Sequence, residues 1–206
     1  MFLHKNPVFF RWLYPSLLWK VKTETKSLYI TFDDGPIPEV TLWVLEQLKL
    51  YDAKATFFCV GENVKRHPEI FDSIVASGYS IGNHTHNHLE GWRTSTSEYL
   101  ANYEQANDAI GPEINPKSLF RPPYGRITRQ QIKSLTNTKI IMWDVLSGDF
   151  DQQLAPQRIL EKSIRATQKG SIIVFHDNIK AFDNLKGVLP EYLKHFSELG
   201  FKFKAL

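Results

Sequence analysis

The chain lacks most of the features that mark special classes of protein. It has one cysteine in 206 residues, Cys59, so no disulfide can form within it. That cysteine lies in an apolar run, residues 55–60, where a buried structural thiol is favoured over a nucleophile. No segment approaches the roughly 18 uninterrupted apolar residues that a membrane-spanning helix needs. The sequence therefore excludes a disulfide scaffold and predicts a globular protein without a transmembrane helix.

The chain also lacks a strong charge of either sign. Its net charge is +3, and residues 1–26 alone carry five basic side chains against one acidic side chain. Residues 27–206 are therefore close to neutral, at about −1. A nucleic-acid-binding protein usually presents a concentrated basic surface. The distribution of charge thus argues against nucleic acid as a partner.

The N-terminal segment, residues 1–26, differs from the remainder in its aromatic and basic content. Arg11 and Pro15 interrupt its apolar residues and no small-residue cleavage site follows, so it does not resemble a signal peptide. We expect it to pack on the domain and to close one end of the core. The alternative is a peripheral membrane contact, with aromatic side chains such as Trp12 in the headgroup layer. The expected location is cytoplasmic or membrane-peripheral.

From Ser27 onward, strand-like and helix-like segments alternate. Apolar runs of strand length occur at 28–32, 55–60, 79–81, 119–120, 139–143, 171–175 and 201–205. Helical spacing occurs between them at 39–48, 68–77, 97–110, 128–135, 156–168 and 184–199. The alternation predicts one α/β domain, residues 27–206, with a parallel sheet. The pattern alone leaves open whether the sheet is a (β/α) barrel or an open doubly wound sheet.

Polar residues stand directly after five of the predicted strands. The clusters are Asp33-Asp34, 84–88, 121–125, 144–149 and His176-Asp177. In α/β folds the carboxyl ends of parallel strands share one edge, and active sites are built there. We therefore expect these distant parts of the sequence to meet at one site.

The histidine cluster indicates a metal site. His84 and His88, four residues apart, would lie on one face of a helical turn with their ring nitrogens directed at one cation. Asp33-Asp34 can add an acid ligand, with one carboxylate on the cation and the other free; the alternative is a simple Asp-Gly turn. Two histidines and one carboxylate also describe non-haem iron oxygenases, but the spacing argues against that class.

Together these residues resemble a known family. Five motifs agree with it in order: Thr31-Phe32-Asp33-Asp34-Gly35-Pro36, His84-Thr85-x-x-His88, Arg121-x-Pro-Tyr124, Trp143–Asp149 and Ile173–His176. They resemble the motifs of the polysaccharide deacetylase family, the NodB-homology domain of certain carbohydrate esterases, over about residues 27–206. The resemblance implies a distorted (β/α) barrel with about seven parallel strands. It also implies a hydrolase that removes acetyl groups from N-acetylated or O-acetylated carbohydrate, such as peptidoglycan or chitin oligosaccharides.

The resemblance implies a role for each matching residue. A divalent metal, usually zinc (Zn²⁺), would be bound by Asp34, His84 and His88. Asp33 would be the general base of the hydrolysis, and His176 would be the general acid.

Other matching residues would support these groups. Arg121 would orient the base, Asp149 would be the charged partner of the acid, and the backbone N–H of Tyr124 would help to hold the oxyanion. The substrate pocket would be lined by Ile173, Pro123 and Trp143. Trp92 and Trp143 are candidates for stacking on sugar rings, with a place in the core as the alternative.

The sequence departs from the family pattern at three positions. The family often has aspartate where Leu146 stands, tryptophan where Phe150 stands and leucine where Ile173 stands. None of these differences removes a metal ligand, the acid or the base, so we expect an active enzyme. The alternative is a catalytically silent module that binds carbohydrate and keeps the metal for structure.

Overall fold

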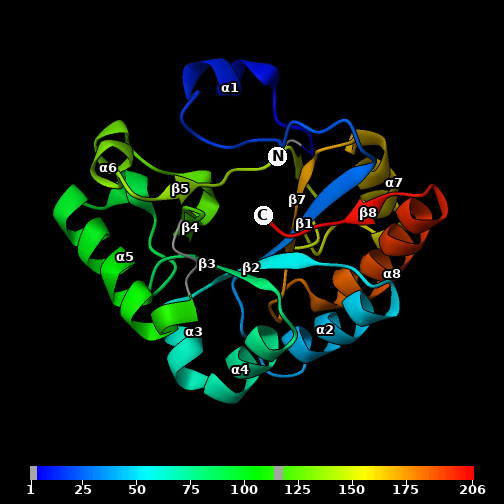
Figure 1. Cartoon of the computed structure of the whole chain (residues 1–206), viewed down its shortest axis with the longest axis horizontal. Helices are drawn as coiled ribbons and strands as arrows, with labels where there is room; N and C mark the ends of the chain where they lie inside the picture. Colours follow the sequence, from blue (N-terminus) through cyan, green and yellow to red (C-terminus); the bar gives the residue numbers. More distant parts are fainter. Residues whose placement is uncertain (1–3, 114–117) are drawn as a thin grey trace.

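One curled parallel sheet forms the centre of the molecule (Figure 1). The computed structural model describes residues 4–113 and 118–206. The strands are β1 Ser27–Asp33, β2 Ala55–Cys59, β3 Ser80–Asn83, β4 Leu119–Phe120, β5 Lys139–Ile140, β6 Val145–Leu146, β7 Ile172–His176 and β8 Lys202–Phe203. Seven of them follow one another in the order β5-β4-β3-β2-β1-β7-β6, every pair parallel, and β8 pairs with β1 off this path. The predicted α/β fold with about seven parallel strands is confirmed.

Helices surround the outside of the curled sheet, which distinguishes the fold from an open doubly wound sheet (Figure 1). They are α1 Val8–Leu13, α2 Val40–Leu50, α3 Gly61–Arg66, α4 Pro68–Ala76, α5 Thr96–Ile110, α6 Arg129–Ser134, α7 Pro156–Ala166 and α8 Phe182–Glu198. Short 3₁₀ turns occur at η1 Gly91–Arg93, η2 Gly111–Glu113 and η3 Pro123–Gly125. The sequence did not predict α3, because Val64 is its one buried apolar side chain and no helical period results.

Alternation along the strands decides which side chains enter the interior of the barrel. On β1, Leu28 and Ile30 belong to the hydrophobic core that packs against the outer helices. Thr31 and Asp33 point the other way, toward a buried arginine. The register between β1 and β7 pairs Asp33 with His176. Because residues opposite each other on paired strands share one face, both side chains face the barrel interior.

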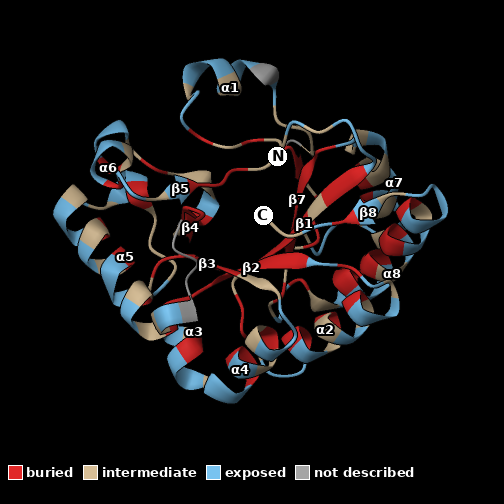
Figure 2. Ribbon diagram, in the orientation of Figure 1, coloured by how far each residue is buried: buried red, intermediate tan, exposed pale blue. Residues whose placement is uncertain are grey.

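The main apolar core lies between the sheet and the outer helices, as the burial colours show (Figure 2). Fully buried side chains come from several of these helices, including Val44 of α2, Ile74 of α4 and Leu189 of α8. Cys59 is buried in the same core, and burial raises the pKa of its thiol well above the ordinary range. The thiol is therefore structural, as its apolar surroundings predicted.

The N-terminal segment pairs with the chain at β5 and β6, the two ends of the strand path. Leu18 forms a parallel bridge with Ile141, and Lys5 forms an antiparallel bridge with Val145. The segment is also tied to the domain by a buried carboxylate, Asp144. This group accepts hydrogen bonds from Lys5 at 2.8 Å and Ser171 at 2.5 Å and pairs with Arg11. The described part of the segment is thus part of the barrel wall.

Some aromatic side chains of α1 remain on the surface. Phe9 is 64% exposed and Trp12 is 81% exposed. The peripheral membrane contact considered for residues 1–26 stays a prediction, and residues 1–3 of that segment lie outside the described range. No helix in the described parts of the chain has the length and apolar character needed to cross a membrane.

Replacement of Asp144 by asparagine should loosen the N-terminal segment. The change leaves Lys5 and Arg11 without their shared counter-charge. It should lower the free energy of unfolding by about 2 kcal/mol, the low end for one partner of a buried charge pair, because both cations keep some contact with water. Chemical denaturation measures this loss, and limited proteolysis should show faster cleavage before residue 26. The control is Glu24→Gln, whose exposed pair with Lys169 should leave stability unchanged.

Candidate metal and catalytic site

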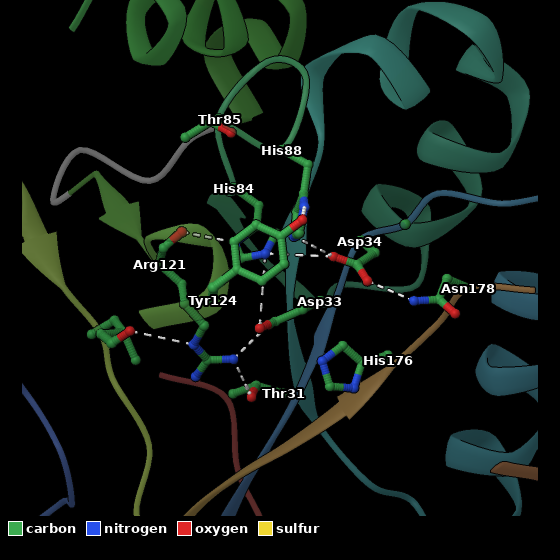
Figure 3. A network of polar contacts seen from close by, with 12 residues as sticks. Thr31, Asp33, Asp34, His84, Thr85, His88, Arg121, Tyr124, His176 and Asn178 are labelled. Carbon is green, nitrogen blue, oxygen red and sulfur yellow. Dashed lines mark hydrogen bonds and ion pairs between the residues drawn. The ribbon is translucent and has the colours of Figure 1, made fainter. Parts of the chain in front are cut away.

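Three side chains from two strand ends converge at the carboxyl edge of the sheet (Figure 3). Asp34 follows β1, whereas His84 and His88 follow β3. Oδ1 of Asp34 lies 3.5 Å from Nε2 of His84 and 3.1 Å from Nε2 of His88. One ligand atom from each residue lies within 4.8 Å of the other two. The structure thus brings together the three residues that the sequence predicted as metal ligands.

The two histidines lie in a loop, so the predicted helical turn is wrong. Thr85 and His88 have φ angles of 63° and 59°, in the left-handed region that a helix does not use. Asn83 stabilises the loop, because its Oδ1 accepts a hydrogen bond from the Thr85 N–H at 2.7 Å. The hydroxyl of Thr85 accepts another from the Leu89 N–H at 2.9 Å. These contacts replace helical hydrogen bonds and still bring the two rings together.

The triad fits a divalent cation. Oδ1 of Asp34 is buried and has no hydrogen-bond donor, although two imidazole nitrogens lie beside it. Burial raises the pKa of the Asp34 carboxyl, but the neighbouring His84 and His88 rings hold it well below its usual range, which favours the charged form. A carboxylate and two imidazoles are a ligand set that suits Zn²⁺ and leaves a position open for solvent or substrate.

Hydrogen bonds to neighbouring residues orient the three side chains of the triad. Nδ1 of His84 lies 2.7 Å from the carbonyl oxygen of Arg121, so it carries the proton and leaves Nε2 free for a cation. Oδ2 of Asp34 accepts a hydrogen bond from the Asn178 side chain at 2.6 Å. Nδ1 of His88 lies 3.1 Å from the hydroxyl of Tyr124. Asn178 was not predicted, although it stands two residues after His176 at the end of β7.

Asp33 is the free carboxylate of the pair, and a buried arginine orients it (Figure 3). Nη1 of Arg121 donates to Oδ1 of Asp33 at 2.6 Å and to the hydroxyl of Thr31 at 2.6 Å. Oδ2 of Asp33 lies 4.0 Å from Nε2 of His84. The second oxygen of Asp33 therefore faces His84, while the first is held by the guanidinium.

His176 stands on the other wall of the site with a carboxylate behind it. Its Nδ1 lies 2.8 Å from Oδ1 of the buried Asp149, and its backbone N–H donates to Oδ2 of the same residue at 2.8 Å. Burial by itself lowers the pKa of the imidazole, but the charge and hydrogen bond of Asp149 outweigh it and raise the pKa to about 9. Asp149 therefore favours the charged form of the His176 imidazole at neutral pH.

A second buried carboxylate, Asp177, holds the turn that carries the two aspartates. Its Oδ1 accepts the Gly35 N–H at 3.0 Å, and its Oδ2 accepts the Thr41 hydroxyl at 2.6 Å. A Cβ on Gly35 would lie 2.0 Å from Oδ2 of Asp177, so only glycine fits there. The sequence showed Asp177 as part of a polar cluster, but its contact with Gly35 depends on the pairing of β1 with β7.

The converging residues open on a cavity of ≈ 530 Å³, whose walls include Trp143, one of the predicted lining residues, and also Tyr124. The structure does not bring Ile173 to this cavity: it lies in the main core, and Val174 lines the cavity instead. Alternation on β7 explains the difference, because Val174 shares a face with His176 and Ile173 does not. Pro123 is buried away from the walls, and its neighbour Pro122 lines them.

Comparison with known proteins agrees with this arrangement. The sequence model of the family described as Polysaccharide deacetylase matches residues 20–143. A peptidoglycan-N-acetylglucosamine deacetylase of Bacillus cereus is 29% identical over 188 residues, which are 90% of this chain and 88% of that protein. A chitooligosaccharide deacetylase of Bradyrhizobium sp. is 32% identical over 158 residues, 74% of this chain and 71% of that protein. The crystal structure of a peptidoglycan N-acetylglucosamine deacetylase with a bound benzamide has a TM-score of 0.88 at 28% identity, covering 98% of this chain and 95% of that one.

Removal of one ligand should abolish metal binding, and a neighbouring histidine provides the control. We expect His84→Ala to lose high-affinity Zn²⁺ binding, whereas His86→Ala, in the same loop but outside the triad, should bind like the wild type. Asn178→Ala should weaken binding about 10–100-fold, because it removes only an orienting contact. Calorimetric titration of chelator-treated protein measures all three. Wild-type affinity in His84→Ala would contradict the assignment of the site.

Proposed function

Because the chain belongs to the polysaccharide deacetylase family, we propose that it removes acetyl groups from acetylated carbohydrate by metal-dependent hydrolysis. The observation that carries the proposal is the single cavity that holds the metal-ligand triad, the carboxylate of Asp33 and the imidazole of His176. The relatives act on N-acetylglucosamine in peptidoglycan and on chitooligosaccharide, as their names state. We therefore take an N-acetylated amino sugar as the substrate in preference to an O-acetylated one.

The metal would be held by Asp34, His84 and His88, with Zn²⁺ as the proposed ion. When bound, it supplies Lewis-acid chemistry, lowering the pKa of a coordinated water toward about 7 and polarising the acetyl carbonyl group. The protein supplies the remaining steps. They need a base for the attacking water, a stabiliser for the oxyanion and an acid for the leaving amine.

Asp33 is the proposed base. It accepts a proton from the attacking water as the water oxygen bonds to the acetyl carbon. Arg121 holds Oδ1 of Asp33, so Oδ2 is the oxygen that faces the reacting centre. The backbone N–H of Tyr124 is the proposed oxyanion donor. Tyr124 has a φ of 58° in the turn η3, and its phenol lies near His88, which supports this role.

His176 is the proposed acid. An amine leaves poorly unless it is protonated, so His176 must give a proton to the sugar nitrogen as the carbon–nitrogen bond breaks. The products are acetate and the free amino sugar. Asp149 keeps His176 charged before the transfer and orients it by a 2.8 Å contact with Nδ1, which leaves Nε2 to act. The proton on Asp33 then returns through solvent to restore both groups.

Replacement of Asp33 by asparagine should abolish turnover while the metal stays bound. Loss of a general base costs about 10²–10⁴-fold in rate, and Asp33 lies outside the triad. The measurement is acetate release from N-acetylglucosamine oligomers alongside metal content. Asp72→Asn, at an exposed position of α4, is the matched control. Wild-type acetate release from Asp33→Asn would end the proposed mechanism, and a fully metal-loaded wild type that releases none would favour the silent module.

The pH dependence of the activity should follow the ionisation of His176, whose pKa is raised by Asp149. Since the pKa of His176 is raised to about 9, the acid is protonated below that value and lost above it, so activity should fall on the alkaline side. Asp149→Asn removes the charge that raises the pKa, so the alkaline limb of kcat/KM should move to lower pH by about 1–3 units. NMR titration of His176 in metal-free protein should show the same direction. If the alkaline limb of kcat/KM in Asp149→Asn stays at the wild-type pH, His176 is not the acid.

A further inference from the structure

Exposed aromatic rings gather on one face of the molecule, beside the mouth of the catalytic cavity. Phe10 of α1, Trp92 of η1 and Tyr124 of η3 are exposed, and all three line one hollow of ≈ 180 Å³. Tyr124 also lines the catalytic cavity. Large apolar patches are uncommon on monomeric proteins and mark places where a protein, a ligand or a membrane makes contact. The rings around this hollow therefore indicate an interaction surface.

The helix α1 extends this surface. Its side chains Phe9, Trp12 and Leu13 are exposed as well, and the ring centroids of Phe9 and Phe10 are 6.1 Å apart. The helix lies on the outside of the barrel, where most of its residues are exposed (Figure 2). The apolar side chains of the three elements are together termed the aromatic patch below: Phe9, Phe10, Trp12, Leu13, Trp92 and Tyr124.

Packing of the N-terminal segment decides the direction of the rings of α1. Arg11 pairs with the buried carboxylate of Asp144, and the ring of Phe10 stacks on that of the buried Trp19. One basic and one aromatic side chain thus attach the helix to the barrel. Its other described apolar side chains stay outside the core. The exposed rings of α1 are therefore directed away from the barrel while the helix itself is tied to it.

Guanidinium groups outnumber carboxylates beside Trp92. The guanidinium of Arg126 lies 5.5 Å from the ring centroid of Trp92 and 5.9 Å from that of Tyr124. Oε1 of Glu90 lies 2.8 Å from Nη1 of Arg126 and 3.6 Å from Nε of Arg93. One carboxylate balances the charge of only one arginine. This side of the aromatic patch therefore keeps a positive charge.

The side of the aromatic patch toward α6 is positive as well. The guanidinium of Arg129 lies 5.9 Å from the ring centroid of Tyr14, which lines the hollow. Residues 114–143, which include η3 and α6, contain six basic side chains and no acidic one. Among the described residues that line the hollow there is no acidic side chain either. The aromatic patch thus combines apolar rings with an excess of positive charge.

We propose that the aromatic patch docks the protein on an anionic membrane surface. Tryptophan and tyrosine rings sit well in the headgroup layer, because each has an apolar body and a polar edge. Arginine side chains beside them attract anionic headgroups. A second copy of the chain fits less well, because a symmetric contact would bring two surfaces of the same charge together. Since Tyr124 lines both hollows, the docked protein holds the mouth of its catalytic cavity at the headgroup layer.

Sedimentation of the full chain with lipid vesicles tests the proposal. The wild type should bind vesicles of mixed phosphatidylglycerol and phosphatidylcholine more tightly than vesicles of phosphatidylcholine alone. Salt at about 1 M, where the Debye length is about 3 Å, should remove most of that difference. We expect Trp12→Ala to weaken binding to the mixed vesicles about tenfold through lost apolar burial. Arg129→Gln should weaken it about fivefold, the effect of one basic side chain near an anionic surface.

Matched controls come from α2, which lies on the opposite side of the barrel from α1 (Figure 1). Leu50→Ala removes an exposed apolar side chain, and Lys49→Gln removes an exposed basic one. Both variants should bind the mixed vesicles like the wild type. All four substituted positions are exposed, so each variant should unfold at the wild-type concentration of denaturant.

Several results would overturn the proposal. They are a wild type that does not bind the mixed vesicles, equal binding to both kinds of vesicle, and equal losses in the α1 and α2 variants. Light scattering that shows a dimer in the wild type and a monomer in Trp12→Ala would assign the rings to self-association and overturn it equally. The assay needs neither metal nor substrate, so its outcome is independent of the proposed function.

Discussion

The buried guanidinium of Arg121 is the constraint on which the site depends. A cation inside a protein is costly unless it is paired and hydrogen-bonded, and Arg121 is fully buried. Its side chain donates to Asp33, to Thr31 and to the carbonyl oxygen of Met142. Its own carbonyl oxygen holds the ring of His84. Arg121 thus orients Asp33 through its side chain and His84 through its backbone.

The two adjacent aspartates have identical side chains but different partners. Asp33 ends β1 and turns inward to the guanidinium of Arg121, whereas Asp34, with a φ of 88°, turns toward the two imidazoles. The fixed turn at Gly35 keeps these directions apart. Identical side chains can take different tasks when their surroundings differ, and here one is held by a cation of the protein while the other is left open for a metal.

Local motifs predicted the three residues that converge at the candidate metal site, whereas tertiary contacts decide the shape of their surroundings. Asp34, His84 and His88 were readable because each sits in a short run at a strand end. The loop around Thr85 was not, because its left-handed φ depends on Asn83, which is itself held by α5 through the carbonyl oxygen of Tyr103. Ile173 was placed in the pocket instead of Val174 because a motif fixes position in sequence and not the face of a strand; the register with β1 supplies that.

The N-terminal segment shows why charge in a sequence does not by itself identify a surface. β5 and β6 end the strand path, and unpaired strand edges invite wrong contacts. Lys5 and Leu18 pair with the chain beside those ends, and Asp144 takes the charge of Lys5 and Arg11 inside the protein. Two of the five basic side chains of the segment therefore stabilise the closed barrel instead of forming a basic surface. The same segment carries Phe10, Tyr14 and Trp19, so closure of the barrel also brings these rings close to Trp143.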